Sequence, residues 1–161
     1  MATTVSFELQ FAVQQMQTRY AQAIDDDKLE DWPDFFIGEG RYRITTVENF
    51  ERGLPLSLIY ATSQAMLRDR VKSLREANVF EAQRYRHVTG LPLIEQGDGG
   101  IITARSSFVV VRIMYTGESL LFASGTYRDK IVRNDGTIPR FAERIVVLDS
   151  HQIDTLLAIP L

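Results

Sequence analysis

Hydrophobic positions in the C-terminal half of the chain follow the two-residue period of β-strands. Three runs rich in Val, Ile, Phe, Tyr and Thr cover residues 101–115, 120–132 and 141–148. Such residues favour a pleated, half-buried surface. The links between the runs, 116–119 and 133–137, contain Gly and Asn and are too short for a parallel return. This half of the chain therefore predicts an antiparallel meander.

Both faces of these predicted strands carry apolar side chains. In the first run Val109, Val111 and Ile113 point to one side, and Phe108 and Val110 point to the other. A sheet with one face in water would alternate apolar and polar residues. Each face must then be covered. Helices of the N-terminal half can cover one, and a ligand, a partner chain or the curling of the sheet itself can cover the other.

The N-terminal half predicts helices that pack on this sheet. Apolar residues recur at spacings of three and four along 5–25 and again from Thr62 or Ser63 to about Ala77, as in amphipathic helices. Further strands are predicted at 41–47, 56–60 and 85–89. Helices gathered on one side of a strongly bent antiparallel sheet form an α+β fold. Because no linker or repeat interrupts the pattern, residues 1–161 are predicted to form a single domain.

A short helix is expected after the acidic cluster that follows the first helix. Asp27 and Glu30 have the spacing of a capping box, in which the two side chains satisfy backbone N–H groups at the start of a helix. Trp32 precedes Pro33 and is expected to be extended, because a residue before proline disfavours the helical region. The acidic cluster is interpreted as a cap and a solvated turn rather than a metal site.

The composition is that of an average soluble protein. Charged residues make up 24% and hydrophobic residues 45% of the chain. The net charge of −3 argues against a nucleic-acid partner, which usually requires a basic surface. No stretch of 18 apolar residues could span a membrane, and Met1–Thr4 does not begin a secretory leader. The expectation is a soluble, cytoplasmic chain without a membrane partner.

Residues that hold metals or act as nucleophiles are scarce. The chain has no cysteine, which excludes disulfides, thiolate nucleophiles and cysteine-ligated iron–sulfur clusters. The two histidines, His87 and His151, fall on different predicted elements and lack the spacing of two ligands on one helix. The scarcity of these ligands predicts that this chain holds no metal and no metal-containing cofactor.

Charged residues inside apolar strands are more informative. Buried or interfacial Arg usually needs a carboxylate partner, and Arg is enriched at protein interfaces, although such residues can also be ordinary solvated positions at a sheet edge. Arg128-Asp129 and Glu143-Arg144 would supply such pairs across strands or across subunits. His87 is interpreted as a hydrogen-bonding residue of the core or an interface, with a general base as the alternative. The residues predicted for a subunit interface are Arg86, His87, Arg105, Arg112, Arg128, Asp129, Arg144, Leu157 and Leu161.

The apolar segment 153–161 closes the sequence. Terminal residues fray unless the fold ties them down. This segment is therefore expected to dock into the core of its own chain or against a neighbouring subunit.

Several stretches, in order and spacing, resemble the small (β) subunits of Rieske-type aromatic ring-hydroxylating oxygenases over nearly the whole chain. They are Tyr20-Ala21-x-Ala23-Ile24-Asp25, Leu29-Glu30-x-Trp32, Asp69-Arg70-Val71, Arg86-His87-Val88-Thr89-Gly90, Ala104-Arg105-Ser106-Ser107-Phe108, Gly125-Thr126-Tyr127-Arg128-Asp129, Phe141-Ala142-Glu143-Arg144 and Leu148-Asp149. Within the family the chain is most similar to the small subunits of enzymes that act on aromatic acids. Salicylate 5-hydroxylase comes first among them and anthranilate dioxygenase second.

The resemblance implies a cone-shaped fold like nuclear transport factor 2, also called cystatin-like, with a curved sheet around N-terminal helices. It also implies a hexamer of three α and three β subunits. The α subunit would carry the Rieske 2Fe–2S cluster and the mononuclear Fe(II). Electrons would come from an NAD(P)H-dependent reductase, sometimes through a ferredoxin. The β subunit would be structural, without catalytic residues of its own, and would support the assembly of the α subunits.

The same fold also hosts stand-alone enzymes such as scytalone dehydratase and ketosteroid isomerase, so fold alone does not decide function. A lyase or isomerase of this kind would need an acid–base residue in a pocket inside the cone. Tyr42, Asp34 and His87 are the candidates in this chain. A ligand-binding or scaffold protein of the same fold is a third alternative.

Overall fold

Within the residues that the computed structural model describes, 4–77, 82–134, 136–152 and 159–161, seven strands form one sheet. The strands are β1 (Phe36–Thr46), β2 (Ile59–Ala61), β3 (Gln83–Thr89), β4 (Leu93–Gln96), β5 (Ile102–Met114), β6 (Ser119–Val132) and β7 (Arg140–Leu148). They follow the order β2-β1-β7-β6-β5-β3, and β4 pairs with β5 beside β3. The long strands β5, β6 and β7 thus form the middle of the sheet.

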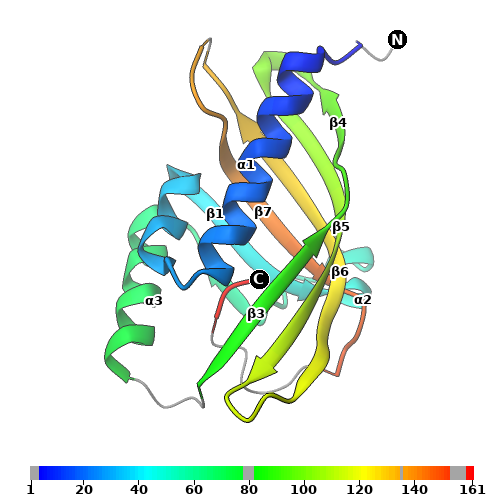
Figure 1. Ribbon diagram of the computed structural model, residues 1–161. Helices are drawn as coiled ribbons and strands as arrows, with labels where there is room; N and C mark the ends of the chain where they lie inside the picture. Colours follow the sequence, from blue (N-terminus) through cyan, green and yellow to red (C-terminus); the bar gives the residue numbers. More distant parts are fainter. Residues whose placement is uncertain (1–3, 78–81, 135, 153–158) are drawn as a thin grey trace.

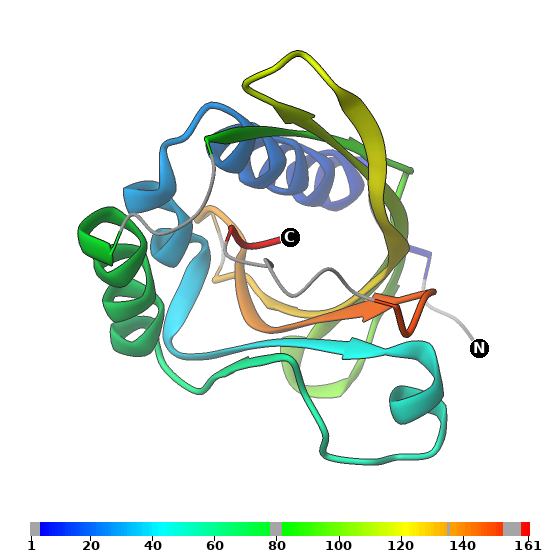
Figure 2. The same ribbon diagram turned by 90° about the horizontal axis from the view of Figure 1, so that it is seen from below.

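The helices are α1 (Phe7–Asp25), α2 (Val47–Glu51), α3 (Gln64–Ala77) and the two 3-10 helices η1 (Leu29–Phe35) and η2 (Asp98–Gly100). α1 lies along the concave side of the sheet and α3 flanks one edge (Figure 1), whereas α2 follows β1 on the outer side, where Phe50 contacts Arg128. Seen from below, the sheet curves around the C-terminal residues, with α1 and η1 completing the ring (Figure 2). We call the curved sheet together with α1 and η1 the cone. The predicted α+β, cone-shaped architecture is confirmed.

The antiparallel meander predicted for the C-terminal half is also confirmed. β5 pairs with β6 and β6 pairs with β7 in antiparallel registers, and β3 and β4 pair with β5 in the same sense. The pairing of β1 is different, because it runs parallel to β7. A parallel pair needs a long crossover, and the elements between β1 and β7 provide it. The sheet is therefore mixed at this position rather than antiparallel throughout.

β-bulges account for part of the curvature of the sheet. A bulge adds a residue to one strand, bends that strand and increases the local twist. The registers shift between Phe36 and Arg41 in the pairing of β1 with β7, between Val110 and Val111 in that of β5 with β6, and between Lys130 and Ile131 in that of β6 with β7. These bends allow the sheet to wrap around α1.

One cluster of buried side chains fills the cone and extends from Leu9 to Leu161. The side chains of β5 alternate between the inner and the outer face of the sheet, as the sequence pattern predicts. Phe108 and Val110 are 2% and 0% exposed, whereas Val109 is 37% exposed. The inner face is thus covered by the helices.

The single domain expected for residues 1–161 stays a prediction. Among the described residues, no helix combines the length and apolar character needed to cross a membrane.

The segment between α1 and β1 differs from the sequence-based expectation. Trp32 is part of η1 rather than extended, and it is fully buried. The predicted capping box is wrong, because Lys28 holds the N-cap position without a side-chain cap and Asp27 has a positive φ of 59°. Asp27 and Glu30 instead bind Arg75 of α3, at 2.9 and 2.7 Å. This contact attaches α3 to η1, and the hydrogen bond from Arg75 lowers the pKa of Glu30.

Candidate subunit interface

Asp129 and Arg144 form an ion pair in the core of the chain. They are paired across β6 and β7, and they are 4% and 1% exposed. Nε and Nη2 of Arg144 donate to the two carboxylate oxygens of Asp129, both at 2.9 Å. Gln17 of α1 donates to the same carboxylate at 3.1 Å. Of the two arrangements that the sequence left open, a pair across strands or across subunits, the chain shows the first. The interface role predicted for these two residues stays a prediction.

Aromatic rings enclose the guanidinium group of Arg144. Its central carbon lies 4.3, 3.8 and 4.2 Å from the ring centroids of Tyr20, Tyr127 and Phe141. Burial disfavours the charged guanidinium, but the Asp129 carboxylate outweighs this effect and raises the pKa of Arg144 above its ordinary value. Arg144 therefore stays charged in the core and connects β7 to the aromatic side of α1.

His87 is also a core residue. Its side chain is 0% exposed, and its Nδ1 lies 2.6 Å from Oδ1 of Asp25 at the end of α1. The backbone N–H of His87 donates to Oδ2 of the same carboxylate at 2.8 Å. Asp25 thus fixes the end of α1 to β3 through two contacts. The hydrogen-bonding role that the sequence favoured for His87 agrees with this geometry, and its predicted place at a subunit interface stays a prediction.

Replacing Asp25 with Ala is expected to lower the free energy of unfolding by about 1–3 kcal/mol, because it leaves a buried N–H group of β3 without its acceptor. Asp25→Asn keeps an oxygen acceptor and should lose less. Asp26→Ala is the matched control, since Asp26 is exposed and should change stability by less than about 0.5 kcal/mol. Urea unfolding followed by circular dichroism measures these differences. Equal stability of Asp25→Ala and Asp26→Ala would show that the contact contributes nothing.

The remaining buried candidates also lie inside the chain. Arg112 is 9% exposed, and its guanidinium group lies 4.6 Å from the ring centroid of Phe122. Leu161 is fully buried, so the end of the chain docks into its own core, which is one of the two alternatives expected for it. Leu157 lies outside the described residues.

The three candidates for a lyase or isomerase site are not brought together. Asp34 lies on the surface, where its carboxylate binds Arg68 at 2.7 Å and its side chain is 62% exposed. Tyr42 is buried and its hydroxyl contacts Leu161, whereas His87 is held by Asp25. The geometry therefore does not assemble an acid–base site from these residues.

Arg86, Arg105 and Arg128 remain as predicted interface residues with side chains at the outer surface. Arg105 and Arg128 stand directly opposite each other on β5 and β6. They line a groove of about 510 Å³ that also includes Phe50, Leu93, Glu95, Thr103, Ala104, Asp129, Lys130, Glu143 and Ile145. We call it the arginine groove. The interface role of these three arginines stays a prediction.

The two opposed arginines stand in a groove that also carries the carboxylates of Glu95 and Glu143. Neither arginine forms an ion pair with a described residue, and Nε of Arg128 is buried without a hydrogen-bond partner among those residues. Arg128 contacts the face of Phe50 instead, with 5.5 Å between its guanidinium carbon and the ring centroid. Like charges directly opposite in a sheet are destabilising. The groove is therefore suited to an anionic group from another molecule.

An apolar strip lies on the same outer face, across β3, β5 and β6. It consists of Val88, Val109, Val111 and Leu121, of which Val88 and Leu121 are 61% and 66% exposed. Exposed apolar patches beside polar residues often mark protein interfaces. The apolar outer face noted in the sequence is thus left uncovered by helices over these strands.

Sequence reasoning missed the partners of the buried polar residues, although a signal was present. Gln17 and Asp25 are eight residues apart and fall on the buried face of α1. Polar residues on the apolar face of a helix indicate buried hydrogen bonds. The partners themselves, Asp129 and His87, depend on tertiary contacts that no local spacing shows.

Within the described residues, no set of side chains is arranged as an iron site would need. A Rieske cluster needs cysteine ligands, and the chain has none. Among the described residues, no three His, Cys, Asp or Glu side chains converge as metal ligands would. These residues do not fit the iron groups that the family resemblance assigns to the larger subunit.

Comparison with known proteins identifies the family. A family model described as the ring hydroxylating beta subunit matches residues 19–155. The chain is 47% identical to the terephthalate 1,2-dioxygenase terminal oxygenase component subunit beta 1 of a Comamonas species, over 96% of this chain and 98% of the relative. It is 41% identical to the anthranilate 1,2-dioxygenase small subunit of Burkholderia cepacia, over 94% and 93% of the two chains.

A solved structure agrees with these relatives. It is described as the beta subunit of a candidate aromatic-ring-hydroxylating dioxygenase from Novosphingobium aromaticivorans, with a TM-score of 0.85 and 34% identity over 94% of this chain and 96% of that chain. Sequence and structure thus point to the same family. The chain belongs to the ring-hydroxylating beta-subunit family, the small subunits of aromatic ring-hydroxylating dioxygenases.

Proposed function

We propose that this chain is the structural small subunit of a terminal oxygenase that hydroxylates an aromatic carboxylic acid. Its role is to hold catalytic α subunits in a hexamer of three α and three β subunits. The α subunits carry the Rieske cluster and the mononuclear iron, and a reductase, directly or through a ferredoxin, supplies electrons from NAD(P)H. The outer face of the sheet, with its uncovered apolar strip and its arginine groove, is the observation that supports this role.

The outer face has the composition of a subunit interface. Apolar side chains supply the area that association buries, and arginines supply specific contacts with carboxylates. In our proposal the apolar strip packs against a neighbouring subunit. The arginine groove binds a carboxylate-bearing segment of the α subunit, which neutralises Arg105 and Arg128. Burial of both features together would stabilise the complex.

The names of the relatives support the proposed substrate class. Terephthalate and anthranilate, named for two of them, are both aromatic rings with a carboxylate. Salicylate has the same chemistry, and a salicylate 5-hydroxylase is the specific enzyme that the sequence resemblance favoured. Because the substrate would bind in the α subunit, the residues of this chain do not select among these acids.

Purification of the tagged chain from source cells grown on each acid, followed by native mass spectrometry and iron and sulfide analysis, tests the proposal. The expected product is a complex with an equal number of larger chains that contain iron and acid-labile sulfide. With its reductase added, this complex should consume oxygen with terephthalate, anthranilate or salicylate. Recovery of the chain alone or only with copies of itself would contradict the structural role. An iron-containing complex that acts on none of these acids would overturn the substrate class alone.

A further inference from the structure

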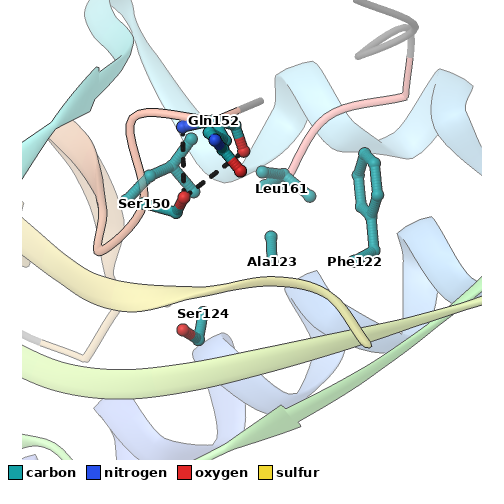
Figure 3. Close-up of a pocket in the computed structure, with 7 residues that line it drawn as sticks. Phe122, Ala123, Ser124, Ser150, Gln152 and Leu161 are labelled. Atoms are coloured by element: carbon teal, nitrogen blue, oxygen red, sulfur yellow. Dashed lines mark hydrogen bonds between the residues drawn. The ribbon is translucent and has the colours of Figure 1, made fainter. Parts of the chain in front are cut away.

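The space inside the cone beside Leu161 is too small for any molecule larger than water. It measures about 20 Å³, which is room for roughly one water molecule. It is lined by Phe122, Ala123, Ser124, Leu148, Ser150, Gln152 and Leu161 (Figure 3). A small organic molecule finds more room on the outer face of the sheet, where the arginine groove has a volume of about 510 Å³.

The strand registers arrange the arginine groove in two rows of side chains. The first row consists, from β7 to β4, of Ile145, Arg128, Arg105 and Leu93. The two arginines thus have an apolar neighbour on each side. Phe50 of α2 adds an aromatic ring to this row, because its face contacts the guanidinium group of Arg128. The first row therefore offers two cations between apolar surfaces.

The second row carries most of the carboxylates of the groove. It consists, from β7 to β4, of Glu143, Lys130, Thr103 and Glu95. Glu143 pairs with Lys130 at 3.6 Å, and Asp129, which also lines the groove, belongs to the buried ion pair of the core. Glu95 is diagonal to Arg105 across β4 and β5. An anion bound to the first row would therefore be repelled chiefly by Glu95.

The first row fits a flat aromatic ring that carries a carboxylate. Guanidinium groups bind carboxylates through charge-assisted hydrogen bonds, and Nε of Arg128 is a buried donor without a partner among the described residues. The attached ring can pack against Phe50 and Leu93 and bury apolar surface there. A small inorganic anion would use the cations alone, and a hydrocarbon would use the apolar surfaces alone. An aromatic carboxylate uses both.

We propose that the arginine groove of the isolated chain is a binding site for a small aromatic carboxylate, with the carboxylate between Arg105 and Arg128 and the ring against Phe50 and Leu93. This site is separate from the substrate site proposed for the α subunit. The acid also competes with the α subunit, a step that rests on the proposed function, because the α subunit would place its own carboxylate in the same groove. High concentrations of the acid then weaken assembly.

A titration of the isotope-labelled full chain with benzoate, followed by NMR, tests the site. Benzamide lacks the charge and acetate lacks the ring, so benzoate is expected to bind at least about tenfold more tightly than either. Arg105→Gln and Arg128→Gln should each weaken benzoate binding about tenfold, because each removes a charge-assisted hydrogen bond. Arg86→Gln is the matched control and should leave the affinity unchanged, since Arg86 is an exposed arginine of β3 that does not line the groove.

Glu95→Gln provides a result that a loss of folding cannot imitate. It removes the negative charge diagonal to Arg105 and should tighten benzoate binding about two- to threefold. Benzoate that does not saturate the wild-type chain would overturn the site, and so would equal affinity of the wild type, Arg105→Gln and Arg128→Gln. Either result would leave the proposed assembly role intact.

The competition is measured on the complex. Benzoate at ten times its dissociation constant should weaken association with the α subunit about tenfold, whereas acetate at the same ionic strength should not. With Glu95→Gln the benzoate concentration needed should be about two- to threefold lower, which ties the effect to the groove rather than to the α subunit. If benzoate binds the isolated chain but leaves association unchanged, the competition is overturned. The groove would then lose its place in the proposed interface, and the ligand site would stand.

Discussion

Replacing Arg144 with Met is expected to lower the free energy of unfolding by about 3–5 kcal/mol, because it leaves the Asp129 carboxylate buried without its counter-charge. The pair is 1% and 4% exposed, so water cannot compensate for the missing guanidinium. The change would also remove the contacts of Arg144 with Tyr20, Tyr127 and Phe141. Since domains of this size have about 5–15 kcal/mol of stability, the loss is a large share of the total. Urea unfolding at low temperature measures it.

Further variants separate the charge from the volume of the side chain. Asp129→Leu combined with Arg144→Met removes both charges and should recover much of the loss, since an apolar pair of similar volume replaces a buried ion pair at little cost. Arg144→Lys keeps the charge but not the paired hydrogen bonds, so it should be intermediate. Arg140→Met is the control on the same strand, because Arg140 is exposed.

The outcome also decides between a core role and an interface role for Arg144. A core role predicts that the isolated chain loses stability in Arg144→Met. An interface role predicts an isolated chain of normal stability that no longer assembles. The second result would support the subunit contact that the sequence suggested and would contradict the importance of the internal pair.

Local patterns were sufficient to predict the longer helices and strands, whereas the short helix α2 and the short strand β4 were not among the predicted elements. The spacing of Leu9, Val13 and Met16 placed α1, and the alternation around Phe108 to Val110 separated the faces of β5 correctly. These signals are local because helix and strand periods are set by backbone geometry within a few residues. The family resemblance added the cone shape, which periodicity alone does not determine.

The absent capping box and the buried ion pair both depend on tertiary contacts. The spacing of Asp27 and Glu30 fits a capping box, but Arg75 from α3, remote in sequence, binds both carboxylates and removes them from that role. Arg144 has the sequence context of an interface arginine, because a charged residue in an apolar strand fits a buried pair and a subunit contact equally well. Only the register of β6 with β7 shows that Asp129 stands opposite it.

The arginine groove is a case in which register creates a site that composition does not show. Arg105 and Arg128 are 23 positions apart in sequence, yet the antiparallel pairing of β5 and β6 puts them directly opposite each other. Each could be an ordinary solvated residue when considered alone. Together they form a pair of like charges beside the apolar strip, and this pairing is what links them to assembly.

The double charge reversal Arg105→Glu with Arg128→Glu is expected to weaken binding to the α subunit by about 2–5 kcal/mol, on the order of 30-fold to several thousand-fold. The reason is that two acidic side chains would face the carboxylate-bearing segment proposed for the groove. Lys72→Glu on α3 is the control for a single charge reversal away from the sheet face, because Lys72 forms its own exposed ion pair with Glu76 there. Affinity of the purified subunits, measured by calorimetry, gives the comparison.

The single change Arg105→Glu distinguishes an interface from a merely structural effect. It places a carboxylate opposite Arg128 on the neighbouring strand and should stabilise the isolated chain by about 0.2–1 kcal/mol, because it converts a repulsive cross-strand pair into an attractive one. The same change should weaken the complex, because the new carboxylate pairs with Arg128 and repels the carboxylate-bearing segment proposed for the α subunit. A chain that becomes more stable while its α subunit binds less tightly is the expected signature. If affinity stays at the wild-type value in both variants, the groove is not where the α subunit docks, and the apolar strip alone would have to carry the contact.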